Sequence, residues 1–191
     1  YGMPKLKTHS KIALVVRKEE DGIRRYLHLG TGNYNDVTAK IYTDHGFLTT
    51  DPTLCDDASA FFNMLTGLSH PPKLKKLIFA PNHLRKELLQ RIDREAENAR
   101  AGRKAEILAK MNSLVDEEVI EHLYDASRAG VTIHLMVRGI CCLRPGIRDV
   151  SENIQVRSIV GRYLEHSRIF CFYADGRREA YLSSADWMPR N

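Results

Sequence analysis

The sequence predicts an α/β fold of two domains, each a mixed β-sheet flanked by helices. Two observations indicate this class. Residues 77–137 alternate strand-like and helix-like segments, which is the pattern of an α/β domain. A histidine-containing unit followed by a hairpin pattern occurs near each end of the chain. The hydrophobic content of 43% over 191 residues is sufficient for a substantial core.

The domain boundary is predicted between Gly67 and Lys76. This stretch contains Pro71-Pro72 and a basic run, and a double proline prevents helix formation and interrupts strand pairing. We therefore expect a first domain over residues 1–72 and a second over residues 73–191. Both are expected to be truncated, because the sequence reads as a piece of a longer protein.

The histidine-containing unit is the most informative feature. Its first copy is Thr8-His9-Ser10-Lys11, which runs into the apolar segment Ile12–Val16, and its second is Glu165-His166-Ser167-Arg168, which runs into Ile169–Tyr173. Because side chains alternate along a strand, the cation two residues after each histidine lies on the same face. Two such units could hold a phosphoryl group between two imidazoles, one attacking and the other handling the proton or the leaving group.

The first unit continues as a hairpin. Its turn is expected near Glu19–Gly22, and its second strand closes on the small-residue segment Gly30–Tyr34, as the second copy closes on Ser183–Trp187. Residues 35–52 are too irregular to assign. Within them, Tyr42 could stack on a base or could equally be a residue at the edge of the core.

A short helix follows, and Asp56 or Asp57 is expected to cap it. Its apolar residues are Phe61, Phe62 and Leu65, and Gly67 would end it. Leu77–Ala80 then has the composition of a buried strand.

The next segment predicts an amphipathic helix that begins at Asn82 and ends by Gly102. Its apolar stripe consists of Leu84, Leu88, Leu89, Ile92 and Ala96. The opposite face is expected to be solvated, and it contains Arg85, Lys86, Arg91 and Arg94.

The remainder of the second domain continues this alternation. A strand around Ile107–Met111 is followed by a helix from Ser113 or Asp116 through Ala129. The strand Val131–Val137 is apolar on both faces, as in a sheet covered by helices, and a further strand is expected over Ile154–Ile159.

An arginine- and glycine-rich loop, residues 138–148, follows the strand Val131–Val137. It carries Arg138, Arg144 and Arg148 among Gly139, Pro145 and Gly146. Ligand loops of α/β sheets lie at the carboxyl ends of strands. Guanidinium groups there can bind phosphate oxygens in pairs, and glycine backbone permits close approach of an anion. We interpret the loop as phosphate-binding.

Composition restricts the partners only weakly. The net charge of +5 and a pI near 9.0 favour polyanions such as phosphates or nucleic acid. The four cysteines show neither metal nor disulfide spacing, which is typical of a reducing cytosol. No apolar run approaches the roughly 18 residues of a membrane span.

Taken together, four strings resemble the catalytic C-terminal half of the polyphosphate kinase family. They are residues 7–11, residues 27–35, the segment Val137–Gly146 and residues 164–168. The resemblance extends over almost the whole chain. It implies two phospholipase D-like domains and reversible transfer of the γ-phosphate of ATP to a growing polyphosphate chain through a phosphohistidine.

The resemblance also implies roles for particular residues. His9 matches the histidine that becomes phosphorylated, and Tyr42, Arg138 and His166 match nucleotide contacts. His166 would act as acid–base partner or as stabiliser of the leaving ADP. Lys11, Arg138 and Arg168 would neutralise phosphate oxygens, and Asn33 could bind a phosphate oxygen or orient His9.

The family further implies magnesium as cofactor, ATP or ADP and inorganic polyphosphate as ligands, and a cytoplasmic homo-oligomer that can associate peripherally with a membrane. Nucleic acid is not an expected partner. The magnesium-binding residues of the family precede Tyr1, so no metal ligand is assigned within this chain. We therefore expect the chain alone to be inactive.

The sequence departs from phospholipase D enzymes at one position of each unit. Those enzymes carry an aspartate five residues after the lysine, whereas Val16 and Tyr173 stand in its place here, and Arg168 replaces the second lysine. Another group must then set the tautomer of the histidine. Two alternatives remain: a phospholipase D-type phosphodiesterase or nuclease, and a non-catalytic basic module that binds nucleic acid.

Overall fold

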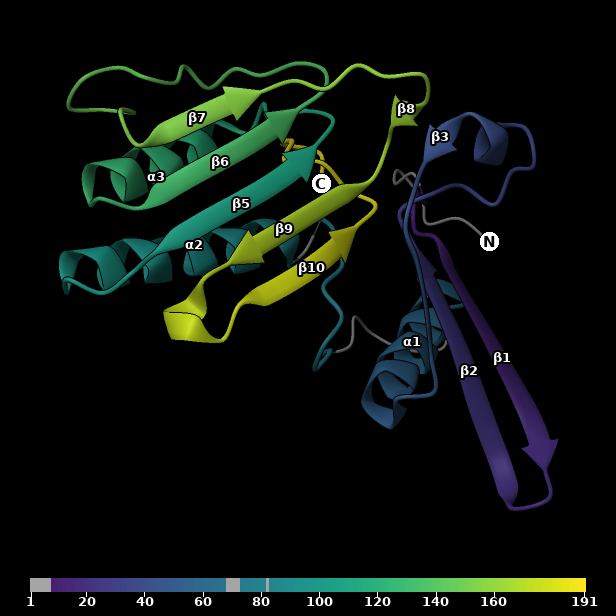
Figure 1. Cartoon of the computed structure of the whole chain (residues 1–191). Coiled ribbons are helices and arrows are strands. Elements are labelled where there is room, and N and C mark those ends of the chain that lie inside the picture. The colour runs from purple at the N-terminus through teal and green to yellow at the C-terminus, as the bar shows by residue number, and fades with distance from the viewer. Residues whose placement is uncertain (1–7, 68–72, 82) are drawn as a thin grey trace.

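The computed structural model describes residues 8–67, 73–81 and 83–191. These residues form two units of sheet and helix that meet along one side (Figure 1). We refer to residues 8–67 as the N-terminal unit and to residues 73–191 as the C-terminal unit. The predicted α/β class is confirmed, since helices and sheets alternate along the chain.

The N-terminal unit is built on a three-stranded antiparallel sheet in the order β1-β2-β4. Its elements are β1 (Ile12–Glu19), β2 (Gly22–Gly30), β4 (Gly46–Thr49) and α1 (Pro52–Leu65). Helix α1 packs on one face of the sheet, and the small core there contains Leu27, Cys55 and Ala58. The predicted hairpin, with its turn before Gly22, is therefore present.

The C-terminal unit contains a five-stranded mixed sheet in the order β10-β9-β5-β6-β7. Strands β5, β6 and β7 are parallel, and β9 and β10 run antiparallel to their neighbours. The strands are β5 (Glu106–Met111), β6 (Thr132–Val137), β7 (Ile154–Arg157), β9 (Arg168–Phe172) and β10 (Glu179–Ser183). Helices α2 (Leu84–Arg100) and α3 (Glu117–Arg128) lie side by side on one face of this sheet (Figure 1).

Several predicted elements differ in their details. Leu77–Ala80 forms no strand, because this segment is held by helix α1 instead of pairing with a sheet. Strand β7 ends at Arg157, two residues earlier than expected. The predicted helix start at Asn82 lies outside the described residues. Asp116 caps α3 by accepting the backbone N–H of Val119. It is one of the two helix starts that the sequence predicted.

The prediction that helices cover the strand Val131–Val137 on both faces is wrong for the described residues. Ile133 and Leu135 are buried toward α2 and α3, but the alternate residues Thr132 and His134 are exposed. The apolar composition of this strand therefore reflects one buried face and not two.

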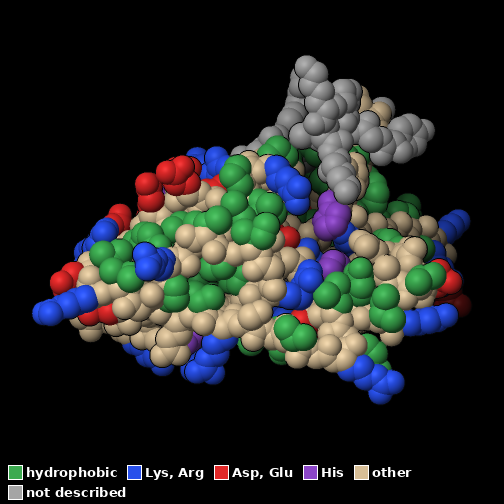
Figure 2. Space-filling view, turned by 90° about the horizontal axis from the view of Figure 1, so that it is seen from above, with side chains coloured by type: hydrophobic (Ala, Val, Ile, Leu, Met, Phe, Trp, Pro, Cys, Tyr) green, Lys and Arg blue, Asp and Glu red, His purple; other side chains and the backbone are tan. Residues whose placement is uncertain are grey.

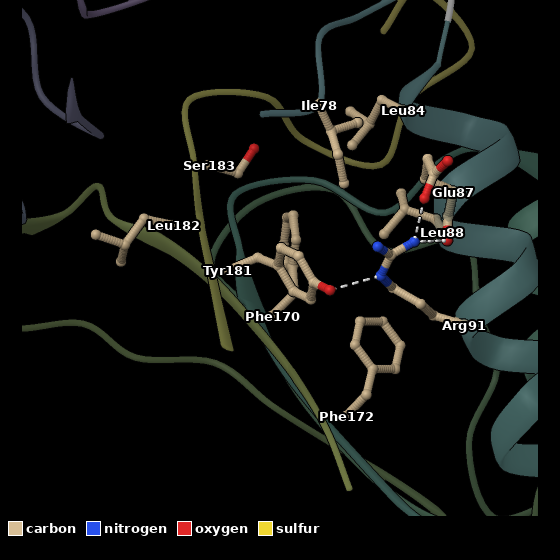
Figure 3. Close-up of a pocket in the computed structure, with 10 residues that line it drawn as sticks. All are labelled: Ile78, Leu84, Glu87, Leu88, Arg91, Phe170, Phe172, Tyr181, Leu182 and Ser183. Carbon is tan, nitrogen blue, oxygen red and sulfur yellow. Dashed lines mark hydrogen bonds and ion pairs between the residues drawn. The ribbon is translucent and has the colours of Figure 1, made fainter. Parts of the chain in front are cut away.

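The charged face of α2 is less solvated than predicted. Arg91 donates to the carboxylate of Glu87 and to the hydroxyl of Tyr181, and it borders an apolar cavity of about 60 Å³ between α2 and strands β9 and β10 (Figure 3). Arg94 forms a paired contact with Glu179, and Arg85 contacts Asp116. These arginines fasten α2 to the rest of the unit.

A two-stranded parallel ribbon joins the two units. It pairs β3 (Tyr42–Thr43) of the N-terminal unit with β8 (Leu164–Glu165) of the C-terminal unit. A short 3-10 helix, Thr38–Lys40, precedes β3, and a second one, Ala174–Gly176, lies between β9 and β10. Strand β3 falls in residues 35–52, which sequence periodicity left unassigned, because a two-residue strand has no measurable alternation.

None of the helices within the described ranges is long and apolar enough to cross a membrane.

The helix-capping prediction for α1 is wrong. Asp51 is the cap and accepts from Leu54 N, whereas Asp57 lies inside the helix and is 4% exposed. Its carboxylate accepts the backbone N–H groups of Lys75, Lys76 and Leu77 at 2.6–3.0 Å. Asp57 thus ties the segment after the boundary to α1.

We expect Asp57→Asn to destabilise the chain by about 2–4 kcal/mol, because it removes a charged acceptor and points an amide N–H at backbone donors. Urea unfolding measures the loss. The neighbouring Asp56→Asn is the matched control: Asp56 pairs with Arg25 and its side chain is 56% exposed, so its loss should cost at most about 1 kcal/mol. Equal costs for the two variants would contradict this role of Asp57.

Candidate active site

The first predicted histidine, His9, lies just before strand β1 and is exposed. Its Nδ1 atom is 3.0 Å from the backbone carbonyl oxygen of Ser184, in the C-terminal unit. A carbonyl oxygen only accepts, so Nδ1 must carry the proton. In the neutral imidazole this leaves the lone pair on Nε2, which is the nucleophilic nitrogen.

The second predicted histidine, His166, is held in a corresponding way. It is 7% exposed, and its Nδ1 lies 2.8 Å and 3.1 Å from the two carboxylate oxygens of Asp44, in the N-terminal unit. The carboxylate also only accepts, so Nδ1 of His166 is protonated and the lone pair of the neutral ring is again on Nε2.

The cations of the two histidine-containing units also correspond. The Nζ atom of Lys11 donates to the carbonyl oxygen of His9 at 2.7 Å, and Nη1 of Arg168 donates to the carbonyl oxygen of His166 at 2.7 Å. Each cation therefore fixes the backbone of its own histidine. Each imidazole is in turn oriented by an acceptor from the other of the N-terminal and C-terminal units. Each of these two units therefore fixes the histidine of the other.

Asp44 supplies the orienting acid that is absent from positions 16 and 173, where Val16 and Tyr173 stand. It also accepts from the hydroxyl of Thr31, which in turn accepts the backbone N–H of His45. A Cβ atom on Gly32 would lie 2.6 Å from a carboxylate oxygen of Asp44, so the small residue is required by the close approach of this acid. The Gly30–Tyr34 turn thus leaves the space in which the Asp44 side chain lies.

The pKa of His166 lies below its usual value near 6.5. Burial is the largest cause, and the positive charges of Arg168 and Lys11 lower the pKa further, whereas Asp44 opposes them. The imidazole is therefore neutral at pH 7. Lys11, the cation of the first histidine-containing unit, is thus among the charges that lower the pKa of the histidine in the second.

Arg168 and Arg138 belong to one polar network at the carboxyl end of β5. Arg168 is 4% exposed and donates to both carboxylate oxygens of Asp186 at 3.2 Å. Asp186 accepts the backbone N–H of Asn112 at 2.7 Å, and the side-chain oxygen of Asn112 accepts two N–H groups of Arg138 at 2.9 Å and 2.7 Å. The predicted arginine loop thus begins beside the second histidine unit.

The remaining predicted residues lie around this junction. The Tyr42 ring lies against the ring of His166 with a centroid separation of 5.0 Å. Asn33 is exposed within the Gly30–Tyr34 turn, and Arg144 and Arg148 are exposed farther along the arginine loop. Figure 2 shows histidine and basic side chains gathered where the two units meet.

A third histidine, His28, is seated next to the first site. Its Nδ1 lies 2.7 Å from the hydroxyl of Tyr34. A Cβ atom on Gly30 or Gly46 would come within 3.3 Å or 2.8 Å of the His28 ring, so both glycines make room for it. His28 fixes the end of the turn that carries Asn33.

Sequence reasoning missed Asp44, Asn112 and Ser184. Asp44 lies in the stretch without periodicity, and Ser184 acts only through its backbone, which leaves no side-chain signal. Asp186 was visible as the counterpart of Asn33 in the duplicated turn, although its pairing with Arg168 was not predicted.

Among the residues the structure describes, no three His, Cys, Asp or Glu side chains converge on a point where they could hold a metal ion.

Comparison with known proteins gives two family matches. Residues 1–71 match the model described as polyphosphate kinase C-terminal domain 1, and residues 77–191 match polyphosphate kinase C-terminal domain 2. Polyphosphate kinases of Lactiplantibacillus plantarum and Halalkalibacterium halodurans are 56% and 58% identical over 191 residues, which is all of this chain and 27% of each relative. The chain therefore spans about a quarter of the length of these relatives.

A solved structure gives the same result for the fold. The crystal structure of the polyphosphate kinase from Porphyromonas gingivalis superposes with a TM-score of 0.90 at 41% identity and covers all of this chain and 32% of that chain. The prediction of phospholipase D-like domains is confirmed by this likeness.

The Asp44–His166 contact predicts a directional change in titration. Asp44→Asn keeps an acceptor for Nδ1 but removes the negative charge that opposes burial. We therefore expect the pKa of His166 to fall further below 6.5 in this variant, measured by NMR titration of the ring signals. Asp93→Asn is the control, because Asp93 contacts the more exposed His122 at 2.6 Å and should leave His166 unchanged.

The same pKa fixes the sign of the effect of pH on stability. The folded-state pKa of His166 is lowered, so below about pH 6.5 the unfolded chain binds the proton more readily. The contribution of His166 is present above that pH and lost as the pH falls toward the folded value. A His166 pKa that rises in Asp44→Asn would contradict this account.

Proposed function

Because the chain belongs to the polyphosphate kinase family, we propose that it is the catalytic part of an enzyme that transfers the γ-phosphate of ATP reversibly to inorganic polyphosphate. The proposal concerns the full-length protein, since the chain spans about a quarter of its relatives. It treats residues 1–72 and 73–191 as the two domains, and the ranges of the family matches support this division.

The observation that carries the proposal is the paired orientation of the two histidines. Both have Nδ1 held by an acceptor, so both neutral rings carry the lone pair on Nε2. In a neutral histidine with a protonated Nδ1 the lone pair lies on Nε2, and this nitrogen is the one suited to attack phosphorus.

In the first step, Nε2 of His9 attacks the γ-phosphorus of ATP in line. A nitrogen–phosphorus bond forms, the bond from phosphorus to the bridging oxygen breaks, and ADP leaves with that electron pair. In the second step a terminal oxygen of polyphosphate attacks the phosphohistidine, the nitrogen–phosphorus bond breaks, and His9 is regenerated. The phosphoramidate is a sufficiently good donor for the steps to run in reverse.

His166 would serve the same transfer as acid–base partner or as stabiliser of the leaving ADP. Its lowered pKa favours the neutral ring, so at pH 7 it begins the cycle as an acceptor at Nε2. Tyr42, whose ring lies against His166, would contact the nucleotide, and Asn33 would bind a phosphate oxygen or orient His9.

The cations divide into two roles. Arg138 lies at the start of the arginine loop and would bind phosphate oxygens, together with Lys11. Arg168 is buried and donates to Asp186 and to the backbone of His166, so we assign it chiefly to holding the second histidine. Magnesium is the cofactor we expect, and its ligands are expected outside this chain.

We expect His9→Ala, made in a full-length polyphosphate kinase that contains this chain, to abolish both labelling by γ-labelled ATP and polymer synthesis, because a covalent intermediate requires its nucleophile. The label should be acid-labile in the unmodified enzyme. His28→Ala is the control, because it removes a neighbouring histidine that is not the proposed nucleophile and should leave the labelling in place. Acid-labile label retained in His9→Ala, or cleavage of a phosphodiester in place of phosphate transfer, would refute the proposal.

Arg138→Lys should keep the charge but lose the planar fork that donates to Asn112 and to phosphate. We expect the KM for ATP to rise roughly tenfold, the equivalent of one hydrogen bond to a charged group. The melting temperature should stay near that of the unmodified enzyme. Arg144→Lys, in the exposed part of the same loop, is the control; an equal effect in both variants would contradict a specific role for Arg138.

A further inference from the structure

Lys110 occupies the face of β5 that the helices do not cover. Its strand neighbours Ala109 and Met111 are buried in the core on the opposite face. β5 pairs with β6 on one side and with β9 on the other, so Lys110 projects from an internal strand of the five-stranded sheet. Its side chain is 19% exposed although it carries a charge. A cation in such a position requires partners.

Both partners of Lys110 are immediate neighbours of His166. The Nζ atom donates to the carboxylate of Glu165 at 2.8 Å and to the hydroxyl of Ser167 at 2.5 Å. Ser167 is fully buried, so its hydroxyl has a fixed position. One ammonium group therefore holds the residues before and after the histidine.

The backbone at His166 is also held from the N-terminal unit. The backbone N–H groups of His166 and Ser167 both donate to the carbonyl oxygen of Thr43, at 3.2 Å and 3.1 Å. These contacts belong to the β3–β8 ribbon, a two-residue pairing that is weak by itself. Lys110 connects this short ribbon to the large sheet.

The charge state of the contact is secure. The hydrogen bond from Lys110 is the largest cause of a lowered pKa of Glu165, and a bond from Thr43 adds to it. Glu165 is therefore ionised at pH 7 and the ion pair is complete. Thr43 and Lys110 approach Glu165 from the two different units.

We propose that Lys110 is a positioning residue for His166: by holding Glu165 and Ser167 it fixes the imidazole between the Asp44 carboxylate and the reacting phosphate. This inference rests on the function proposed above. In this positioning role Lys110 does not contact the substrate. An error of about 1 Å in the place of a reacting group can cost about a hundredfold in rate, so a staple of this kind has a large effect on kcat.

A purely structural role makes a different prediction. A surface or half-buried ion pair that only joined two elements would change the stability of the chain and leave the His166 ring as it was. The Arg94–Glu179 pair provides the matched control, because it is also half-buried, has contacts of 2.9 Å and 3.1 Å, and lies between α2 and β10 away from His166.

The test compares Lys110→Met, Lys110→Arg and the control Arg94→Met in the 191-residue chain by NMR of the histidine ring nitrogens. We expect a single Nδ1-protonated form of His166 in the unmodified chain and in Arg94→Met. Lys110→Met should give a mixture of tautomers or a second set of His166 signals. Lys110→Arg should restore the single form, because it keeps the charge and can reach both partners.

In the full-length enzyme, Lys110→Met should lower kcat by about tenfold to a hundredfold while KM for ATP stays within about twofold, as expected for loss of positioning without loss of binding. His166 signals unchanged in Lys110→Met, or a kcat equal to that of Arg94→Met at equal stability, would overturn the proposal. A raised KM with kcat unchanged would also overturn it, because Lys110 would then bind substrate directly.

The NMR comparison needs no activity. If the unmodified enzyme forms no phosphohistidine, the proposed function fails, while the response of the His166 ring to Lys110→Met still decides whether Lys110 positions it.

Discussion

The contact between the His166 imidazole and the Asp44 carboxylate is the interaction on which the site depends. The two residues are 122 positions apart, and their contact has to be made across two units that each have a separate core. The contact from His9 to the Ser184 carbonyl crosses the same junction in the opposite direction. Neither unit alone can fix the tautomer of its own histidine, so the paired arrangement exists only when both units are docked.

The two copies of the histidine unit have diverged in their charge. The position in the small-residue turn is Asp186 in the second copy and Asn33 in the first. Asp186 compensates the buried Arg168, and a buried guanidinium without such a partner would be strongly destabilising. Asn33 carries no charge and is exposed. The second copy therefore has a buried ion pair at this position, whereas the first copy places a neutral, exposed amide there.

The sequence predicted the fold class, and it singled out two histidines and their cations from local patterns that repeat: a histidine before a strand, an i+2 cation and an Asp-Gly turn. The structure brings these residues to one junction, and their roles stay predictions. The sequence did not predict Asp44, because an acid that follows a two-residue strand leaves no periodic signal and its partner lies in the C-terminal unit. Local sequence patterns also gave wrong predictions for Asp57, which was expected as a possible helix cap, and for Arg91, which was expected to be solvated. Both are charged residues whose partners come from segments distant in sequence, at Lys75–Leu77 and at Tyr181.

The electrostatic balance at the junction explains how a buried histidine can lie beside a carboxylate and remain neutral at pH 7. The positive charge that the proposed function needs there, to bind phosphate oxygens, also disfavours an imidazolium. Burial, Arg168 and Lys11 all lower the pKa of His166, and Asp44 opposes them only in part. The carboxylate therefore selects the tautomer without restoring the charge of the ring. His166 therefore combines a neutral ring and a single tautomer with a position beside several cations, which is the state that the proposed acid–base role requires.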